Sequence, residues 1–201
     1  MKEDLWGFKG VQAELKNELK RRGYSAKGST FARLHPSGNS LLIASQRSTK
    51  STHLETLVTL NYGVYSAQIG RWLEDEPTAA RDITRAHWRR RIRESGREKW
   101  IRIASESSNE DASRELLEQL SLAATDLENH GSDENLRDDW LVGVSPGLTE
   151  IERLLYLAIL LHQIGPRDRL AEVLAALRSL VEGRPQEGIV RRQLRTIWVT
   201  Q

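Results

Sequence analysis

Five of the seven residues from His87 to Arg93, in the sequence HWRRRIR, are basic or can become basic. An arginine guanidinium presents a planar fork of N–H donors that matches a carboxylate or a phosphate. The imidazole of a histidine can donate or accept a hydrogen bond near neutral pH. We therefore select His87, Arg89 and Arg91 as candidate binding residues.

The same stretch also fits a structural role. The segment Asp82 to Arg93 reads as a possible short helix, in which Trp88 and Ile92, four residues apart, would anchor it to the rest of the fold. In such a helix the arginines spread around the axis, whereas a surface that tracks phosphates needs them on one face. The pattern favours arginines that are paired within the chain.

Three further candidates come from two expected strands. Gln46 and Arg47 lie near the end of one apolar run, and Asn61 lies in the next one. We expect these positions to fall at corresponding ends of neighbouring strands, because the two runs are joined in sequence like a meander. Polar groups that border an apolar sheet must find partners, so the alternatives are local backbone bonds or a ligand.

Signatures of enzymes and bound cofactors are missing from the sequence. It has no cysteine, and the five histidines show neither metal-ligand spacing nor a nearby carboxylate pair. The acidic run Glu74-Asp75-Glu76 reads as a turn, and no Gly-x-Ser-x-Gly elbow is present. The sequence predicts no catalytic residue, no metal and no cofactor.

Charge is strongly segregated along the chain. Residues 1–105 hold 20 Lys or Arg and 11 Asp or Glu, residues 106–139 hold 2 and 11, and residues 140–201 hold 8 and 6. The formal net charge of +2 therefore conceals one strongly basic and one strongly acidic segment. A chain that folds its acidic segment against its basic one needs no polyanionic partner for neutralisation. We expect the acidic segment to lie beside the basic part.

The first half of the chain predicts an α+β fold. A helix at residues 6–22, with an apolar residue at every fourth position, should cover an antiparallel meander of four strands. The expected strands are residues 30–34, 40–45, 53–65 and 99–103. Alternation in the third of these predicts one apolar and one polar face.

The second half predicts a helical extension from residue 110 to residue 201, packed on the α+β domain of residues 1–105. A helical stripe covers residues 112–128, and residues 129–139 read as a mobile loop rich in polar and turn residues. Residues 148–164 and 169–182 form a helical hairpin around Gly165-Pro166, and residues 189–199 favour a last helix. Trp72, Trp140 and Trp198 lie outside the clear apolar stripes. Tryptophan is favoured at interfaces, but at least two of the three should pack this extension against the sheet.

The order of several phrases resembles the bacterial domain-of-unknown-function family 4304 over about residues 5–105. The phrases are a helix end at Leu19–Tyr24, then Thr30–Arg33, Ile43–Ser48, Val58–Tyr65, His87–Ile92 and Lys99–Ile103. This resemblance implies an α+β domain. It implies no activity, so no catalytic residue is inherited from it.

These observations give three functional hypotheses. The first is a non-enzymatic bacterial interaction protein of the cytoplasm that binds another protein, for example as an immunity or defence-associated factor. The second is a nucleic-acid-binding protein that uses residues 81–102. The third is an enzyme or sensor for a small anionic ligand. No run of apolar residues is long enough to span a membrane, and oligomeric state is not encoded in any pattern we find.

Overall fold

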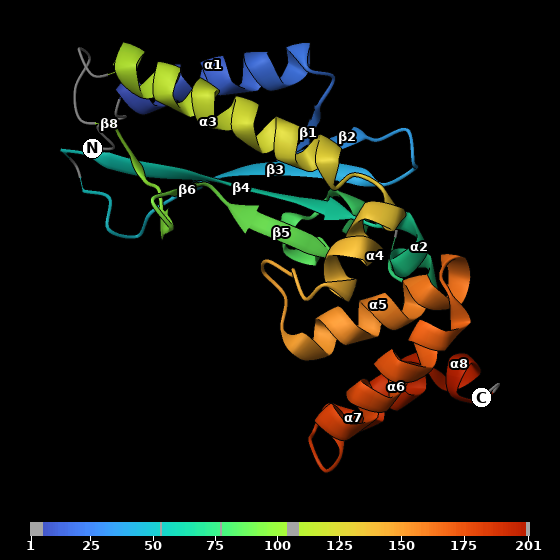
Figure 1. Ribbon diagram of the computed structural model, residues 1–201. Helices are drawn as coiled ribbons and strands as arrows, with labels where there is room; N and C mark the ends of the chain where they lie inside the picture. Colours follow the sequence, from blue (N-terminus) through green and yellow to red (C-terminus); the bar gives the residue numbers. More distant parts are fainter. Residues whose placement is uncertain (1–5, 53, 77, 104–108, 200–201) are drawn as a thin grey trace.

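The computed structural model describes residues 6–52, 54–76, 78–103 and 109–199. Helices α1 (Trp6–Arg21) and α3 (Asn109–Asn129) lie side by side over one face of an antiparallel sheet. The remaining helices lie on the other side of the sheet and beyond its end (Figure 1). The α+β prediction is confirmed.

Helix α1 forms as its apolar spacing predicts. Val11, Leu15 and Leu19 follow one another at four-residue intervals, and all three are buried against the sheet and α3. The helix ends at Gly23, whose φ of 82° places it in the left-handed region that a side chain disfavours.

The sheet has six strands, two more than the sequence predicts. Strands β1 to β5 pair in chain order, and β8 joins the same edge of β4 as β5 does, nearer to the start of that strand. Their bounds are β1 Ser25–Lys27, β2 Thr30–Leu34, β3 Ser40–Arg47, β4 Thr56–Tyr65, β5 Trp88–Arg91 and β8 Ile101–Ile103. The four predicted strands are present, although the predicted residue His53 lies outside the described residues.

The predicted short helix at Asp82–Arg93 is wrong. Two 3-10 turns, η1 (Ala79–Arg81) and η2 (Ile83–Arg85), lead into strand β5, and a small ribbon of β6 (Arg93–Glu94) and β7 (Arg97–Glu98) follows. The segment from Trp88 forms a strand and not a helix, because alternation along a strand places Trp88 in the core beneath the helices. The anchoring role predicted for Trp88 and Ile92 holds, since both are buried.

The second face of the sheet is not simply polar. At one end Ala32, Leu42 and Tyr65 form a small apolar cluster that is closed by Ala79 and Ala86 from the segment before β5. The other end of this face stays open. Because this cluster covers only one end of the face, polar side chains at the other end of the face remain accessible.

The acidic helix α3 forms ion pairs with basic residues of the sheet and its loops, as the charge pattern predicts. Glu128 pairs with Arg33, Asp126 pairs with Arg90 at 2.9 Å, and Glu115 pairs with Lys99 at 2.7 Å. The partners come from three different strands or loops. The two oppositely charged segments therefore form one internal interface.

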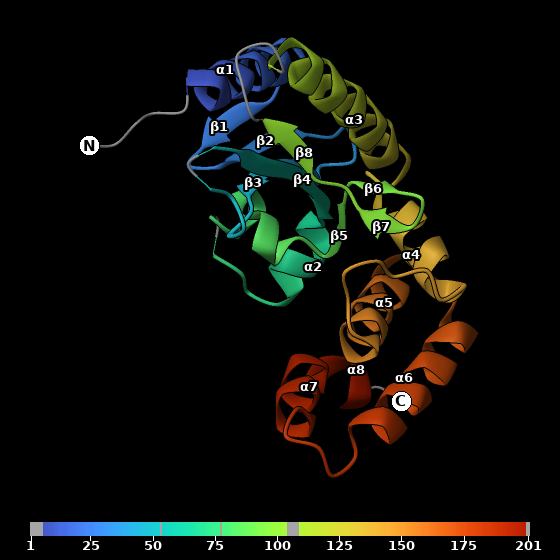
Figure 2. The ribbon, with the colours of Figure 1, turned by 90° about the vertical axis from the view of Figure 1, so that its left-hand side faces the viewer.

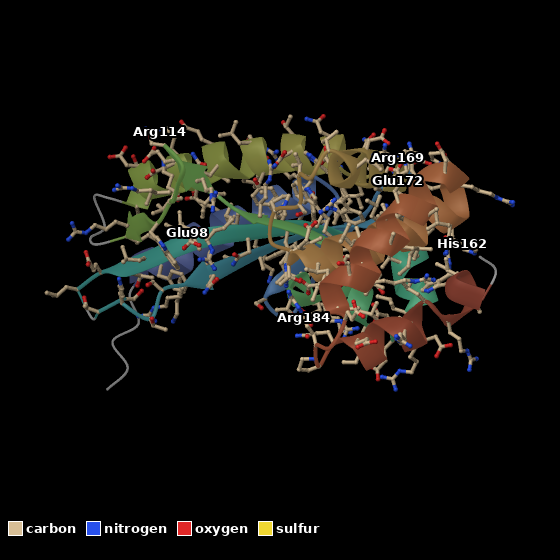
Figure 3. The ribbon with its side chains drawn as sticks, turned by 60° about the horizontal axis from the view of Figure 1, so that its bottom comes forward. Glu98, Arg114, His162, Arg169, Glu172 and Arg184 are labelled. Atoms are coloured by element: carbon tan, nitrogen blue, oxygen red, sulfur yellow. The ribbon has the colours of Figure 1, made fainter. Side chains whose placement is uncertain are left out.

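The C-terminal part contains helices α4 (Asp133–Leu141), α5 (Glu150–Ile164), α6 (Arg167–Val181), α7 (Glu187–Gln193) and α8 (Arg195–Val199). Figure 2 shows α5 to α8 on the opposite side of the sheet from α1 and α3. The predicted hairpin of α5 and α6 is confirmed. Figure 3 shows Glu98 of the ribbon at one end of the molecule and His162 of α5 at the other.

The predicted mobile loop at 129–139 is wrong, because α4 occupies most of it. Ser132 caps this helix by accepting a hydrogen bond from the Asn135 amide, and Leu136 and Trp140 are fully buried on one side. Two buried residues four positions apart are enough to dock a nine-residue helix whose other faces are charged.

Tryptophans join the two halves, as predicted. Trp140 is buried in the main core, and Trp72 of α2 (Ala67–Trp72) donates its Nε1–H to the carbonyl of Gln193 at 2.8 Å. The side chain of Trp198 lies outside those described.

Asn39 connects three segments beneath the sheet. Its side chain is 1% exposed; its Nδ2 donates to the Gly131 carbonyl and to Asp133 Oδ1, both at 3.0 Å, and its Oδ1 accepts from the Ala67 amide at 2.9 Å. One amide thus ties the β2–β3 turn to the starts of α2 and α4.

Candidate binding cleft beside strand β5

A cleft of about 1110 Å³ surrounds the edge strand β5. One wall is α3, another is the open half of the sheet, and η2 and the loop before α5 close it below; Figure 1 shows that loop reaching back towards β5. Its polar and charged lining residues include Gln46, Asn61, Thr84, Arg89, Arg90, Arg91, Arg93, Glu98, Gln119 and Asp126. We call this space the β5 cleft.

Three predicted residues meet on the open sheet face. Asn61 Nδ2 donates to Gln46 Oε1 at 2.9 Å, and Arg91 donates to both residues at 3.0 Å. Arg91 also pairs with Glu98 at 2.6 Å. The register explains the meeting, because Asn61 lies opposite Arg91 on β5 and opposite Ala44, two residues before Gln46, on β3.

Arg89 holds the lower rim of the cleft. Its Nε and Nη2 donate to the Gly147 carbonyl at 3.1 and 3.0 Å, and its Nη1 donates to the Thr84 carbonyl at 2.8 Å. Gly147 has a φ of 76°, and a Cβ there would lie 2.6 Å from the Arg89 carbonyl oxygen. Among the described residues Arg89 has no carboxylate partner, so its charge is not neutralised locally.

Arg90 points to the opposite face and belongs to the helix interface. It donates to both carboxylate oxygens of Asp126, at 3.2 and 2.9 Å, and lies over the ring of Trp88 at 5.0 Å. Tyr62 donates its hydroxyl to the same carboxylate at 2.9 Å. Burial, and then the nearby Asp126 charge, raise the pKa of Tyr62, so its hydroxyl stays protonated and keeps this donor role.

Asp126→Asn is expected to lower the free energy of unfolding by about 1–3 kcal/mol, because a neutral amide replaces the acceptor of three hydrogen bonds. Asp111→Asn is the matched control: Asp111 pairs with Arg114 in an exposed i,i+3 contact on the same helix, and should cost less than about 0.5 kcal/mol. Chemical denaturation measures both. Equal losses in the two variants would contradict the role of Asp126.

Two predicted residues lie outside the β5 cleft. Arg47 is exposed at the end of β3, on the sheet face opposite to Gln46. His87 is 2% exposed and packs between the rings of Tyr65 and Tyr156, with centroid distances of 4.6 and 4.9 Å. Its Nδ1 accepts a hydrogen bond from the Ser66 amide at 3.0 Å.

Sequence reasoning missed the contribution of α3 to the cleft. Leu122 of α3 lines it and is 65% exposed. Asp126 and Gly147 were also missed. The acidic character of α3 predicted that Asp126 would lie near basic residues. Only the fold shows that this helix runs along β5.

In the described part of the chain, no three His, Cys, Asp or Glu side chains are grouped so as to hold a metal ion. No helix in these described segments has the length and apolar character required to cross a bilayer.

The fold and the β5 cleft define an α+β protein in which an antiparallel sheet carries two helices on one face and an arginine-lined cleft at its edge. The family model described as "Domain of unknown function (DUF4304)" matches residues 15–128, and the chain belongs to this family. The matched region runs from α1 to the end of α3 and so includes the acidic helix. No curated protein and no solved structure matches the chain.

Proposed function

We propose that this protein is a non-enzymatic binding protein whose β5 cleft takes an acidic segment of another protein. The observation that carries the proposal is the charge of the cleft. Its lining contains four arginines, Arg89, Arg90, Arg91 and Arg93, against two carboxylates, Glu98 and Asp126. The cleft is therefore net positive, and a segment with one or two carboxylates would complement it.

Leu122 supports a protein segment as the occupant. Arg89 of β5 and the exposed apolar side chain of Leu122 on α3 both line this cleft. Interfaces between proteins combine an apolar contact with a polar rim of this kind. An acidic segment with one apolar side chain can satisfy both walls.

Nucleic acid fits this cleft less well. Arg90 and Arg91 already pair with Asp126 and Glu98, and these carboxylates face the same space, where they would repel phosphates. Tyr62, the single aromatic residue among the described lining residues, is buried and offers no face for base stacking. We further propose a bacterial, cytoplasmic setting, in which immunity or defence is one role for such binding.

Quantitative affinity capture from the organism of origin tests the proposal. We expect Leu122→Glu to reduce the capture of specific partner proteins at least tenfold, because it adds a negative charge to an exposed position without disturbing the core. Arg89→Gln should have a similar effect. Arg47→Gln is the matched control, an exposed arginine outside the cleft, and should capture as the wild type does.

Nuclease treatment of the lysate should leave the captured proteins unchanged. Capture that is lost after nuclease treatment, or that Leu122→Glu and Arg47→Gln reduce equally, would contradict the proposal.

A further inference from the structure

A second cavity, of about 440 Å³, lies where the family domain meets the C-terminal helices. The family domain contributes Asp75, Arg85, His87 and Arg89 among others, α5 contributes Glu152 and Tyr156, and α7 contributes Gln193. This volume suits a small molecule. It is distinct from the β5 cleft, although Arg89 and Thr84 border both.

His87 presents an unused donor to this cavity. Since Nδ1 accepts the Ser66 amide proton, the neutral ring carries its own proton on Nε2. Among the described residues Nε2 has no hydrogen-bond partner; the nearest carboxylate oxygen, Asp75 Oδ2, is 4.0 Å away. Burial, and then the charges of Arg85 and Arg89, lower the pKa of His87 to about 3, so the ring is neutral at physiological pH.

Tyr156 provides a second donor. Its ring packs edge-on against His87, and its hydroxyl makes no hydrogen bond within the described part of the chain. Burial, followed by the charge of Glu152, raises the pKa of Tyr156 to about 12, which keeps the hydroxyl proton in place. Two uncharged donors thus border one cavity.

The carboxylates of the cavity are already engaged. Asp75 pairs with Arg85 and accepts the Tyr65 hydroxyl at 3.0 Å. Glu152 closes the N-terminus of α5 by accepting from the Thr149 amide and hydroxyl, at 2.7 and 2.9 Å. The Arg85 guanidinium uses a single nitrogen in its described hydrogen bond, so further N–H groups remain for a ligand.

We propose that this cavity binds a small monocarboxylate. The carboxylate accepts hydrogen bonds from His87, Tyr156 and Arg85, which together form a mixed neutral and charged donor set. Leu73, Ala86 and Leu148 also line the cavity, but its surface is mainly polar, so recognition rests on the carboxylate. Glu152 would repel a second negative charge, which selects against dicarboxylates and phosphates.

Such a ligand would bridge the family domain and α5, and would therefore stabilise their contact by mass action. This inference does not depend on the β5 cleft, because the variants that test it leave Leu122 and Arg91 untouched.

Titrations with propionate, monitored by NMR of the His87 imidazole in the full chain, test the proposal; the His87→Asn variant assigns the resonance. We expect a saturable shift with propionate, and at least tenfold weaker binding of propionamide, its neutral isostere. Arg85→Gln should weaken propionate binding at least tenfold and Tyr156→Phe about fivefold, because the first loses an ion pair and the second loses a hydrogen bond from an uncharged donor.

Tyr156→Phe removes one hydroxyl without an internal partner among the described residues, so it should fold normally. Arg47→Gln serves as the control and should bind propionate like the wild type. Equal affinity for propionate and propionamide, a shift that does not saturate, or unchanged binding in Tyr156→Phe would overturn the proposal.

Discussion

Replacing Asn39 by leucine is expected to lower the free energy of unfolding by about 3–5 kcal/mol. Leucine has a similar volume, so the loss comes from hydrogen bonds rather than packing. Without the Asn39 amide, the Gly131 carbonyl, the Ala67 amide and the Asp133 carboxylate each lose a partner, and Asp133 is itself buried. Buried polar groups left without partners cost more than the mean value of a hydrogen bond.

Asn17→Leu is the matched control. Asn17 lies on the exposed side of α1, and the same substitution there should change the free energy of unfolding by less than about 0.5 kcal/mol. Urea denaturation of both variants gives the comparison. A loss below about 1 kcal/mol in Asn39→Leu would show that Asn39 is not the connection between the turn and helices α2 and α4.

Mild acid is expected to destabilise the protein through His87. The pKa of His87 falls from 6.5 to about 3 in the folded state, first because the ring is buried and then because Arg85 and Arg89 are near. Between these two values the unfolded chain holds a proton on His87 that the folded chain lacks. The stability is therefore complete above pH 6.5 and falls by about 1.4 kcal/mol for each pH unit below it.

The variant His87→Asn isolates this effect. An asparagine can still accept the Ser66 amide proton but does not titrate. At pH 7 the variant should be the less stable protein, because it loses the ring contacts with Tyr65 and Tyr156. Between pH 7 and pH 5 the wild type should lose about 2 kcal/mol relative to the variant. Parallel curves of unfolding free energy against pH would contradict a buried, neutral His87.

Regular alternation made much of the sheet and its covering helix predictable. Leu15 and Leu19 mark the buried side of α1, and the run from Val58 to Val64 alternates over enough residues to fix a strand and its core face. The neighbouring positions of Gln46 and Asn61 followed from these strands. Their side chains are hydrogen-bonded. The predicted position of Asn61 at a strand end is wrong, because β4 continues on both sides of it and places Asn61 in the middle of the strand.

Strand β5 could not be recognised from its own residues. An edge strand with arginines on both faces lacks the apolar alternation that indicates a strand, and Arg90 reaches its core-facing position by lying over Trp88. Helix α4 was missed for a related reason, since Leu136 and Trp140 are its only fully buried large apolar residues and its other residues include six that are polar or charged. In both cases tertiary packing decides the local structure.

Only those residues of the β5 cleft that lie on the sheet could be predicted from the sequence. Residues such as Leu122 come from a helix far away in sequence, and their place in the β5 cleft depends on how α3 crosses the sheet. Arg47 and His87, predicted together with the sheet residues of the cleft, lie outside the β5 cleft. Their residue types suit binding, but strand parity points Arg47 away from the cleft, and packing between two tyrosines buries His87.

Site-specific photocrosslinking from position 122 tests the binding role of the β5 cleft most directly. A photoreactive amino acid would replace Leu122 in the full chain within cells of the organism of origin, and a second one would replace Leu34, an equally exposed residue of β2 that does not line the cleft. We predict discrete protein adducts from position 122 that resist nuclease, disappear when Arg89→Gln is added, and are absent from position 34. Adducts removed by nuclease, identical adducts from both positions, or none from position 122 would contradict an acidic protein segment as the occupant of this cleft.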